Sequence, residues 1–352
     1  MSLFEPYSLG NLRLQNRIVM APMTRSRAIG NVPNELMAEY YKQRSGAGLL
    51  ITEGTAPSPN GLGYARIPGN FSDVQLAGWH KVSTAAHAGG AKIFLQLMHT
   101  GRISHPLNLP DGAEVIAPSA VRASGQMWTD QVGMQDYPTP RALENREIAD
   151  VIAEYVAASK NAITAGFDGI ELHGANGYLI EQFLNPRANM RTDNYGGSLQ
   201  NRNYFALDVS AAIARAIGAD KTAIRISPFN TFNDMVGDYK EIPQQYEALA
   251  QGLGKLKLVY VHVVAYSKVG ESLLRVIKKA FGGPIIINGG LDKQKAEAAF
   301  DDGYAELAAF ATGFLANPDL PHRLKNGLPL NVPDPSTFYS AGAKGYTDYP
   351  NA

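Results

Sequence analysis

The sequence predicts an α/β protein with the (β/α)8 architecture of a TIM barrel. Eight short apolar runs alternate with stretches of helical periodicity along the chain. Most runs are apolar without interruption, which is typical of strands buried on both faces of a parallel sheet. A doubly wound sheet is the competing fold, but it favours a glycine-rich dinucleotide loop after the first strand. The sequence there is "MAPMTRSRA", and no GxGxxG or GxxxxGK[ST] motif occurs anywhere.

The eight runs are the expected barrel strands. They are, in chain order, "RIVMAPM" (17–23), "GLLITEG" (48–54), "KIFLQLM" (92–98), "FDGIELHG" (167–174), "TAIRIS" (222–227), "LVYVHVV" (258–264), "PIIINGG" (284–290) and "AELAAFA" (305–311). Each has the length of a strand, and a helical pattern or a loop separates it from the next.

Helix-capping residues mark several of the expected helices. Ser72 is a favourable N-cap for a helix that ends at Gly89-Gly90. Residues 145–166 form a long amphipathic pattern that leads into the fourth strand. In "NPDLPHRL", Asn317 is expected to cap a helix whose first position is Pro318.

Two segments decorate the expected barrel, which we predict to be one domain over residues 1–352. The stretch "YSLGNLRLQNR" predicts a hairpin that turns at Gly10-Asn11 and closes the bottom of the barrel. Residues 99–144 are long and rich in Pro, Gly and Ser. Because loops of that length in a compact domain are usually functional, we expect a capping excursion over the active face.

The composition narrows the classes of function. The chain has 32 basic and 32 acidic residues, and no basic run stands out, so nucleic-acid binding is not expected. No apolar stretch has the length of a membrane span, and the N-terminus lacks a secretory pattern. The absence of cysteine excludes disulfides and thiolate chemistry. The composition fits a cytoplasmic protein, and we expect a monomer or homodimer that acts on small molecules, with no metal site.

Polar residues gather where the expected strands end, which is the active face of this fold. The stretch "ELHGANGYLIEQF" places three of them within six positions. The set comprises Thr24, Gln96, His173, Asn176, Tyr178, Arg225, Gly289 and Gly290. A permanent positive charge, an amide and a hydroxyl suit a planar heterocycle that gains negative charge on reduction. Because the loops after strands seven and eight usually hold phosphate, flavin mononucleotide (FMN) meets both requirements.

The chain resembles the old yellow enzyme family of FMN-dependent ene-reductases, in particular the N-ethylmaleimide reductase and morphinone reductase type. The motifs that carry the resemblance span nearly the whole chain. They are "NRIVMAPMTRSRA" (16–28), "GLLITEGT" (48–55), "IFLQLMHTGRISHP" (93–106), "AGFDGIELHGANGYLIEQFL" (165–184), "RTDNYGGSLQNR" (191–202), "AIRISPF" (223–229), "NPDLP" (317–321) and "GYTDYP" (345–350).

The resemblance implies an activity and a set of residues. NADH or NADPH would reduce FMN, and hydride from flavin N5 would then reach the β-carbon of an α,β-unsaturated carbonyl or nitro compound. His173 and Asn176 would polarise the carbonyl oxygen, and Tyr178 would protonate the α-carbon. The implied FMN-binding residues are Pro22, Met23, Thr24, Gln96, Arg225, Gly289, Gly290, Ala311 and Thr312. The implied substrate-binding residues are Tyr64, Met98, His173, Asn176 and Tyr346.

The sequence departs from the family pattern at the eighth strand. The family usually has Gly-Arg there, and the arginine holds the FMN phosphate, whereas this chain has Ala311-Thr312. Met98 also stands where the family often has tryptophan, which predicts a roomier pocket wall. The departure at Thr312 leaves open an alternative function, a barrel without FMN that acts as a binding protein. A Schiff-base aldolase would need a lysine inside a strand, and Lys92 merely opens the third run.

Overall fold

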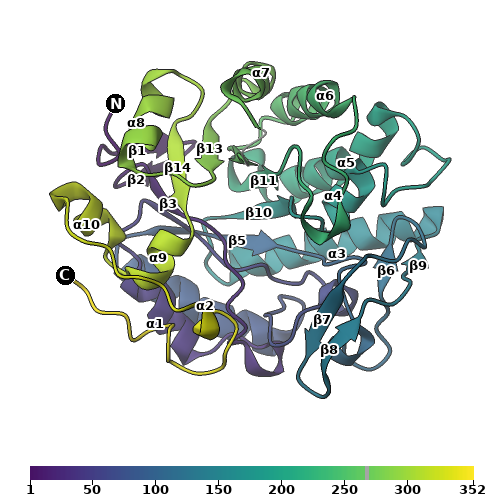
Figure 1. Cartoon of the computed structure of the whole chain (residues 1–352), viewed down its shortest axis with the longest axis horizontal. Coiled ribbons are helices and arrows are strands. Elements are labelled where there is room, and N and C mark those ends of the chain that lie inside the picture. Colours follow the sequence, from purple (N-terminus) through teal and green to yellow (C-terminus); the bar gives the residue numbers. More distant parts are fainter. Residues whose placement is uncertain (266–268) are drawn as a thin grey trace.

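The computed structural model describes residues 1–265 and 269–352. Eight parallel strands form a closed barrel in chain order, and helices surround it (Figure 1). The strands are β3 (Ile18–Met20), β4 (Leu49–Ile51), β5 (Lys92–Leu97), β10 (Gly169–Gly174), β11 (Thr222–Ile226), β12 (Val261–Val264), β13 (Ile285–Asn288) and β14 (Leu307–Phe310). Each lies within one of the eight predicted runs, so the predicted TIM barrel is confirmed.

Helices follow most of the strands and cover the outside of the barrel (Figure 1). They are α1 (Glu35–Gln43), α2 (Asp73–Ala88), α3 (Asn145–Thr164), α4 (Leu179–Leu184), α5 (Leu199–Ile217), α6 (Ile242–Lys255), α7 (Glu271–Phe281), α8 (Lys293–Asp301), α9 (Thr312–Ala316) and α10 (Leu320–Asn326). Short 3-10 helices are η1 (Ile29–Asn31), η2 (Pro59–Gly61), η3 (Pro106–Asn108), η4 (Ala219–Lys221), η5 (Phe232–Asp234) and η6 (Pro335–Thr337).

Two capping predictions have different outcomes. Ser72 caps α2 as expected, and Gln75 completes a capping box. The prediction for the last helix is wrong, because α10 begins at Leu320. The Asn317 side chain instead donates to the carbonyl of Gly313 and accepts from the amide of Asn331, so it joins two segments rather than capping a helix.

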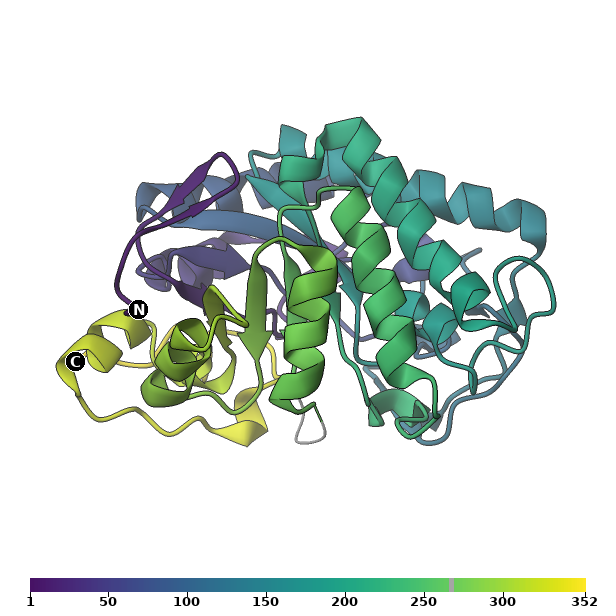
Figure 2. The same cartoon turned by 90° about the horizontal axis from the view of Figure 1, so that it is seen from above.

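The N-terminal hairpin closes one end of the barrel, as predicted. Strands β1 (Tyr7–Leu9) and β2 (Leu12–Leu14) pair antiparallel. Leu9 and Leu14 are fully buried in a cluster with residues from inside the barrel, among them Phe94 and Tyr260. Figure 2 shows the hairpin on the opposite side of the molecule from the C-terminal segment. The other end of the barrel is therefore the one that can hold a site.

The excursion after β5 forms small strands of its own. Strands β6 (Ile116–Ala117) and β9 (Arg141–Ala142) pair in parallel, and β7 (Gln126–Thr129) and β8 (Gly133–Asp136) form a hairpin. Figure 1 shows this hairpin standing apart from the barrel strands. That the chain is a single domain stays a prediction. Among the helices described, none is long and apolar enough to cross a membrane.

Candidate active site

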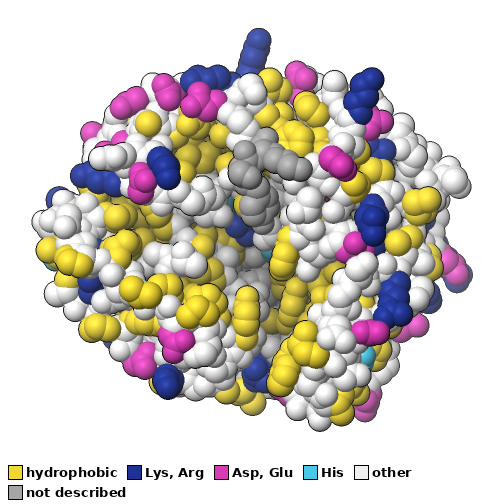
Figure 3. All heavy atoms as spheres, in the orientation of Figure 1, with side chains coloured by type: hydrophobic (Ala, Val, Ile, Leu, Met, Phe, Trp, Pro, Cys, Tyr) yellow, Lys and Arg dark blue, Asp and Glu magenta, His cyan; other side chains and the backbone are white. Residues whose placement is uncertain are grey.

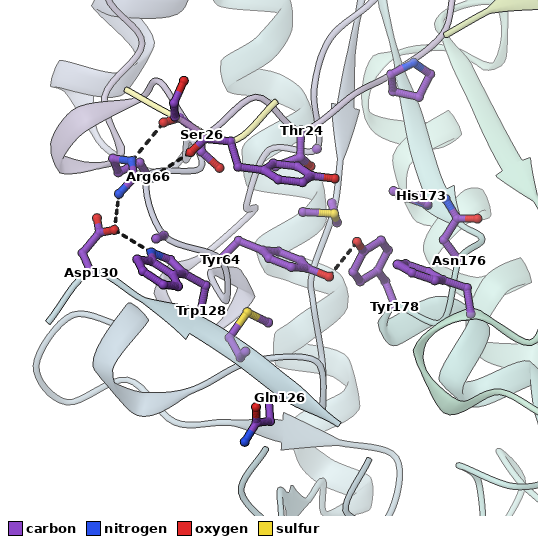
Figure 4. A pocket seen from close by; sticks show the side chains of 18 of the residues that line it. Thr24, Ser26, Tyr64, Arg66, Gln126, Trp128, Asp130, His173, Asn176 and Tyr178 are labelled. Atoms are coloured by element: carbon purple, nitrogen blue, oxygen red, sulfur yellow. Dashed lines mark hydrogen bonds and ion pairs between the residues drawn. The ribbon is translucent and has the colours of Figure 1, made fainter. Parts of the chain in front are cut away.

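A cavity of about 780 Å3 opens at the carboxyl ends of the barrel strands. Nine of the residues predicted from the sequence line it: Pro22, Thr24, Tyr64, Gln96, Met98, His173, Asn176, Tyr178 and Arg225. Figure 4 shows several of them facing one another from different elements. We call Thr24, Gln96, His173 and Arg225 the floor, because Thr24 lies in the loop after β3 and the other three lie on barrel strands.

Strand register brings the floor residues together. In the parallel sheet, Gln96 lies opposite Glu171, and His173 lies opposite Arg225. The Gln96 amide donates to the buried Glu171 carboxylate over 2.8 Å, which fixes the orientation of the carboxamide. The Arg225 guanidinium donates to Asn288 Oδ1 over 3.0 Å. The sheet therefore presents an oriented amide and a guanidinium to one cavity, and the loop after β3 adds the Thr24 hydroxyl.

The His173 ring is held as a hydrogen-bond donor. The backbone amide of Ala175 donates to His173 Nδ1 over 3.3 Å, so in the neutral ring the proton is on Nε2. Burial lowers the pKa of His173 well below its ordinary value, and the charge of Arg225 lowers it further. His173 is therefore neutral near pH 7.

The loop that carries Asn176 has a strained backbone held by a buried carboxylate. Asn176 and Gly177 have φ angles of +57° and +81°, a region that residues other than glycine seldom adopt. Glu181 Oε2 accepts from the Gly177 amide at 2.6 Å, and from Ser227 and Asn230 at 3.0 Å each. The Ser227 hydroxyl in turn accepts from the Asn176 amide over 2.9 Å. This network stabilises the loop conformation that turns Asn176 toward the cavity.

Tyr178 is a protonated phenol in an apolar setting. Its hydroxyl donates to the hydroxyl of Tyr64 over 3.0 Å (Figure 4). Its ring meets that of His173 edge to face, with the centroids 4.8 Å apart. Burial raises the pKa of Tyr178 to about 12. The phenol therefore keeps its proton across the physiological range.

Four other predicted cofactor residues lie together at the edge of the barrel. Gly289 and Gly290 directly follow β13, and Ala311 and Thr312 directly follow β14, which pairs with β13. We call these four residues the lip. Gly289 has a φ of +136°, and a Cβ there would lie 2.3 Å from the carbonyl oxygen of Ala265, so the position requires glycine. The lip residues are not among the described residues that line the cavity, and neither is Met23.

One predicted substrate residue is wrong. Tyr346 is fully buried, and its ring stacks on Tyr40 with the centroids 4.0 Å apart. The guanidinium groups of Arg25 and Arg27 lie over the same ring. Tyr339, seven residues earlier, lines the cavity instead.

Sequence reasoning also missed a group of residues at the cavity mouth. Arg66, Trp128, Asp130, Met134 and Phe232 all line the cavity. Arg66 lies in a loop, Phe232 begins η5, and the other three belong to the β7–β8 hairpin. No motif marks them. The length of the 99–144 excursion indicated that a functional segment was present, without naming its residues.

Comparison with known proteins identifies the family. The model of the NADH:flavin oxidoreductase / NADH oxidase family matches residues 2–331. The chain belongs to this family. It is 44% identical to chanoclavine-I aldehyde reductase of Penicillium roqueforti, with 99% of this chain and 95% of the relative covered. It is 42% identical to 12-oxophytodienoate reductase 1 of Oryza sativa subsp. japonica, with coverages of 99% and 92%.

Solved structures agree with that assignment. Morphinone reductase in complex with tetrahydroNAD superposes with a TM-score of 0.96 at 42% identity, covering 100% of this chain and 98% of that one. The old yellow enzyme homologue from Zymomonas mobilis gives a TM-score of 0.95 at 38% identity, with 99% of each chain covered. The predicted family, an FMN-dependent oxidoreductase with a nicotinamide reductant, is confirmed.

The floor fits the flavin of this family. A flavin ring has donors and acceptors along its pyrimidine edge, and it gains negative charge when reduced. Gln96 and Arg225 can serve that edge and that charge, and both are nearly buried. The floor therefore has the donor set that the ring requires. The lip offers backbone amides and the Thr312 hydroxyl for a phosphate, with no arginine at Ala311 or Thr312.

Proposed function

We propose that the protein is an NAD(P)H-dependent ene-reductase that saturates the activated C=C bond of α,β-unsaturated carbonyl or nitro compounds. The observation that carries the proposal is the grouping of His173, Asn176 and Tyr178 in one cavity. Two of these side chains can donate hydrogen bonds to a substrate oxygen, and the third keeps a proton that it can deliver.

FMN, when bound, supplies the hydride chemistry between NAD(P)H and the alkene. We propose that Thr24, Gln96 and Arg225 hold its ring, while Pro22 and Met23 line its edge. The lip residues Gly289, Gly290, Ala311 and Thr312 would bind its phosphate. Because an arginine-to-phosphate hydrogen bond contributes about 1.5–3 kcal/mol net, Thr312 predicts affinity roughly ten- to a hundredfold below that of an arginine-bearing relative.

The chain's own residues complete the reaction. His173 Nε2–H and the Asn176 amide donate to the carbonyl oxygen of the substrate, where negative charge develops as the β-carbon is reduced. Tyr178 then delivers its phenolic proton to the α-carbon. Tyr64 holds the Tyr178 hydroxyl in place through the bond of 3.0 Å between them. Met98, packed against Gly54, forms part of the pocket wall.

The visible spectrum of the purified protein tests this function. We expect a flavin spectrum after loading with FMN and desalting, bleaching with NADH or NADPH under anaerobic conditions, and recovery on addition of 2-cyclohexenone. Protein that stays colourless after loading would instead support the alternative, a binding protein whose lip has lost the cofactor. If the flavin bleaches but no enone, maleimide or nitroalkene restores its spectrum, the ene-reductase proposal is contradicted. The protein would still be a flavoprotein that accepts electrons from NADH or NADPH.

A further inference from the structure

Four large apolar side chains border the mouth of the cavity and are more than half exposed. They are Trp128 (53%), Met134 (51%), Phe232 (57%) and Tyr339 (63%). We call them the apolar rim. They come from the β7–β8 hairpin, from η5 and from the C-terminal segment. Figure 3 shows apolar side chains bordering the hollow on this face of the molecule. Scattered exposed apolar residues are ordinary, but four that face one cavity indicate a ligand.

Two of the four rim residues, Trp128 and Tyr339, are connected through one side chain, Arg66. Its guanidinium forms an ion pair with Asp130, which also accepts from the Trp128 indole over 3.0 Å (Figure 4). It donates further to the carbonyls of Ser26 at 3.0 Å and Tyr339 at 2.9 Å. The two rim aromatics therefore share an anchor, although they are more than two hundred residues apart in the chain.

Arg66 has a strained backbone, which indicates that the contacts of its side chain hold it in this conformation. Its φ angle is +57°, where a side chain other than glycine costs about 1–2 kcal/mol. Such strain is found mainly at functional sites, where the surrounding structure compensates for it. Here the compensation is the set of contacts that holds the rim.

The charged side chains at the mouth indicate what kind of ligand it suits. Arg66 and Asp130 neutralise each other, and the remaining charged side chain among the described residues that line the cavity is Arg225 on the floor. Among the described residues at the mouth, no charged side chain outside this ion pair lines the cavity to attract the pyrophosphate of a dinucleotide. The mouth suits an uncharged apolar group that extends outward from the reacting alkene.

We propose that the apolar rim is an outer subsite for a neutral alkyl or ring body attached to the activated alkene. This inference rests on the proposed function and adds the class of substrate. The reacting group would lie over the floor, and the apolar body would lie between Trp128, Phe232 and Tyr339. Substrates with such a body would be preferred to small enones.

A homologous series of N-alkylmaleimides measures this preference. The chain has no cysteine, so these probes meet no thiol on the protein. We expect kcat/KM to rise about two- to fourfold for each methylene from N-methyl to N-hexyl, the upper value being the full burial of one CH2 group. The double variant Trp128→Ala, Phe232→Ala should reduce that gain to nearly none. Met190→Ala is the matched control, since this exposed methionine does not line the cavity, and it should keep the full gain.

Binding of N-alkylsuccinimides separates the subsite from the chemistry. These saturated counterparts accept no hydride, so calorimetry reports their affinity for the FMN-loaded protein without turnover. The subsite is supported if the affinity for N-alkylsuccinimides rises with alkyl length and the rim variant loses that rise. This result would support the subsite even if the protein failed to reduce maleimides and the proposed function were wrong. A flat series, or an equal rise in the rim variant, would overturn the subsite. It would be overturned as well if the rim variant slowed flavin reduction by NADH or NADPH and left the alkyl gain intact, because the rim would then serve the coenzyme.

Discussion

Two arginines face the same cavity and are held in opposite ways. Arg225 lies on β11, is nearly buried, and donates to Asn288 on β13. Arg66 lies in a loop with a strained backbone and contacts three separate segments. The barrel thus fixes the floor through strand register, whereas side-chain contacts assemble the rim. We infer that the floor sets the reaction and that the rim sets which molecules undergo it.

Replacement of Tyr178 by Phe, next to the floor residue His173, should have the largest effect on the reaction. Proton transfer by a placed side chain typically contributes about 10²–10⁴ in rate, so we expect reoxidation of the reduced flavin by an enone to slow by about 10³. The loss should be the same for short and long substrates. Stopped-flow absorbance with N-methyl and N-hexyl maleimide measures both. Tyr64→Phe is the matched control, since it removes the hydrogen-bond partner and keeps the proton donor.

The same variants give a pH test. Because burial raises the pKa of Tyr178 to about 12, the phenol stays protonated well above pH 8. The wild-type rate should therefore show no loss from Tyr178 ionisation between pH 8 and 10. A decrease centred near pH 9 that disappears in Tyr178→Phe would contradict the assigned environment.

The floor was predictable from sequence because its residues follow buried strands. Gln96, His173 and Arg225 belong to apolar runs and Thr24 directly follows one, so the fold alone places them at one face. The rim was not predictable, since the bond from Arg66 to Tyr339 joins residues 273 positions apart. Tyr346 was misassigned for a related reason. A local motif does not reveal which of two nearby tyrosines packs between arginines and which faces the cavity.

A third region, the lip, can be tested through its affinity for FMN. Thr312→Arg would restore a charge that the family usually places after the eighth strand. We expect the dissociation constant of FMN to fall roughly ten- to a hundredfold, because a charged hydrogen bond to phosphate contributes about 1.5–3 kcal/mol. Fluorescence quenching of free FMN measures it.

Thr312→Gln serves as the control, since it adds length and polarity without charge. Riboflavin, which lacks the phosphate, should bind equally well to wild type and Thr312→Arg. An unchanged affinity for FMN would mean that the lip does not hold the phosphate.

Glu181 should give the reaction a pH dependence, through the Asn176 loop, that the alkyl preference of the rim should lack. Burial raises the pKa of Glu181 to about 7, against the opposing hydrogen bonds from Gly177, Ser227 and Asn230. Its ionised form accepts these bonds most strongly, so the Asn176 loop should be best ordered above pH 7. We expect the enone half-reaction to speed up about three- to tenfold between pH 6 and 8, in line with one charged hydrogen bond.

In the Glu181→Gln variant the enone half-reaction should be slow, and its rate should not change between pH 6 and 8. The buried Glu53 also has a pKa raised to about 7 by burial, so Glu53→Gln is the necessary comparison. If the pH dependence disappears in Glu53→Gln and persists in Glu181→Gln, the titrating group is Glu53, and the loop network does not control the rate.

The smallest expected effect isolates the strain at Arg66. Both Arg66→Ala and Arg66→Gly remove the ion pair with Asp130 and the bonds to Ser26 and Tyr339, but glycine adopts a φ of +57° without cost. The alanine variant should therefore be less stable to urea than the glycine variant by about 1 kcal/mol. Equal stabilities would mean that the loop relaxes once the guanidinium is gone. In that case the contacts of the rim impose the strained backbone, and the backbone does not pre-form the rim. The same two variants also test substrate preference. If the rim depends on the Arg66 side chain, the rise of kcat/KM with alkyl length should disappear in both variants.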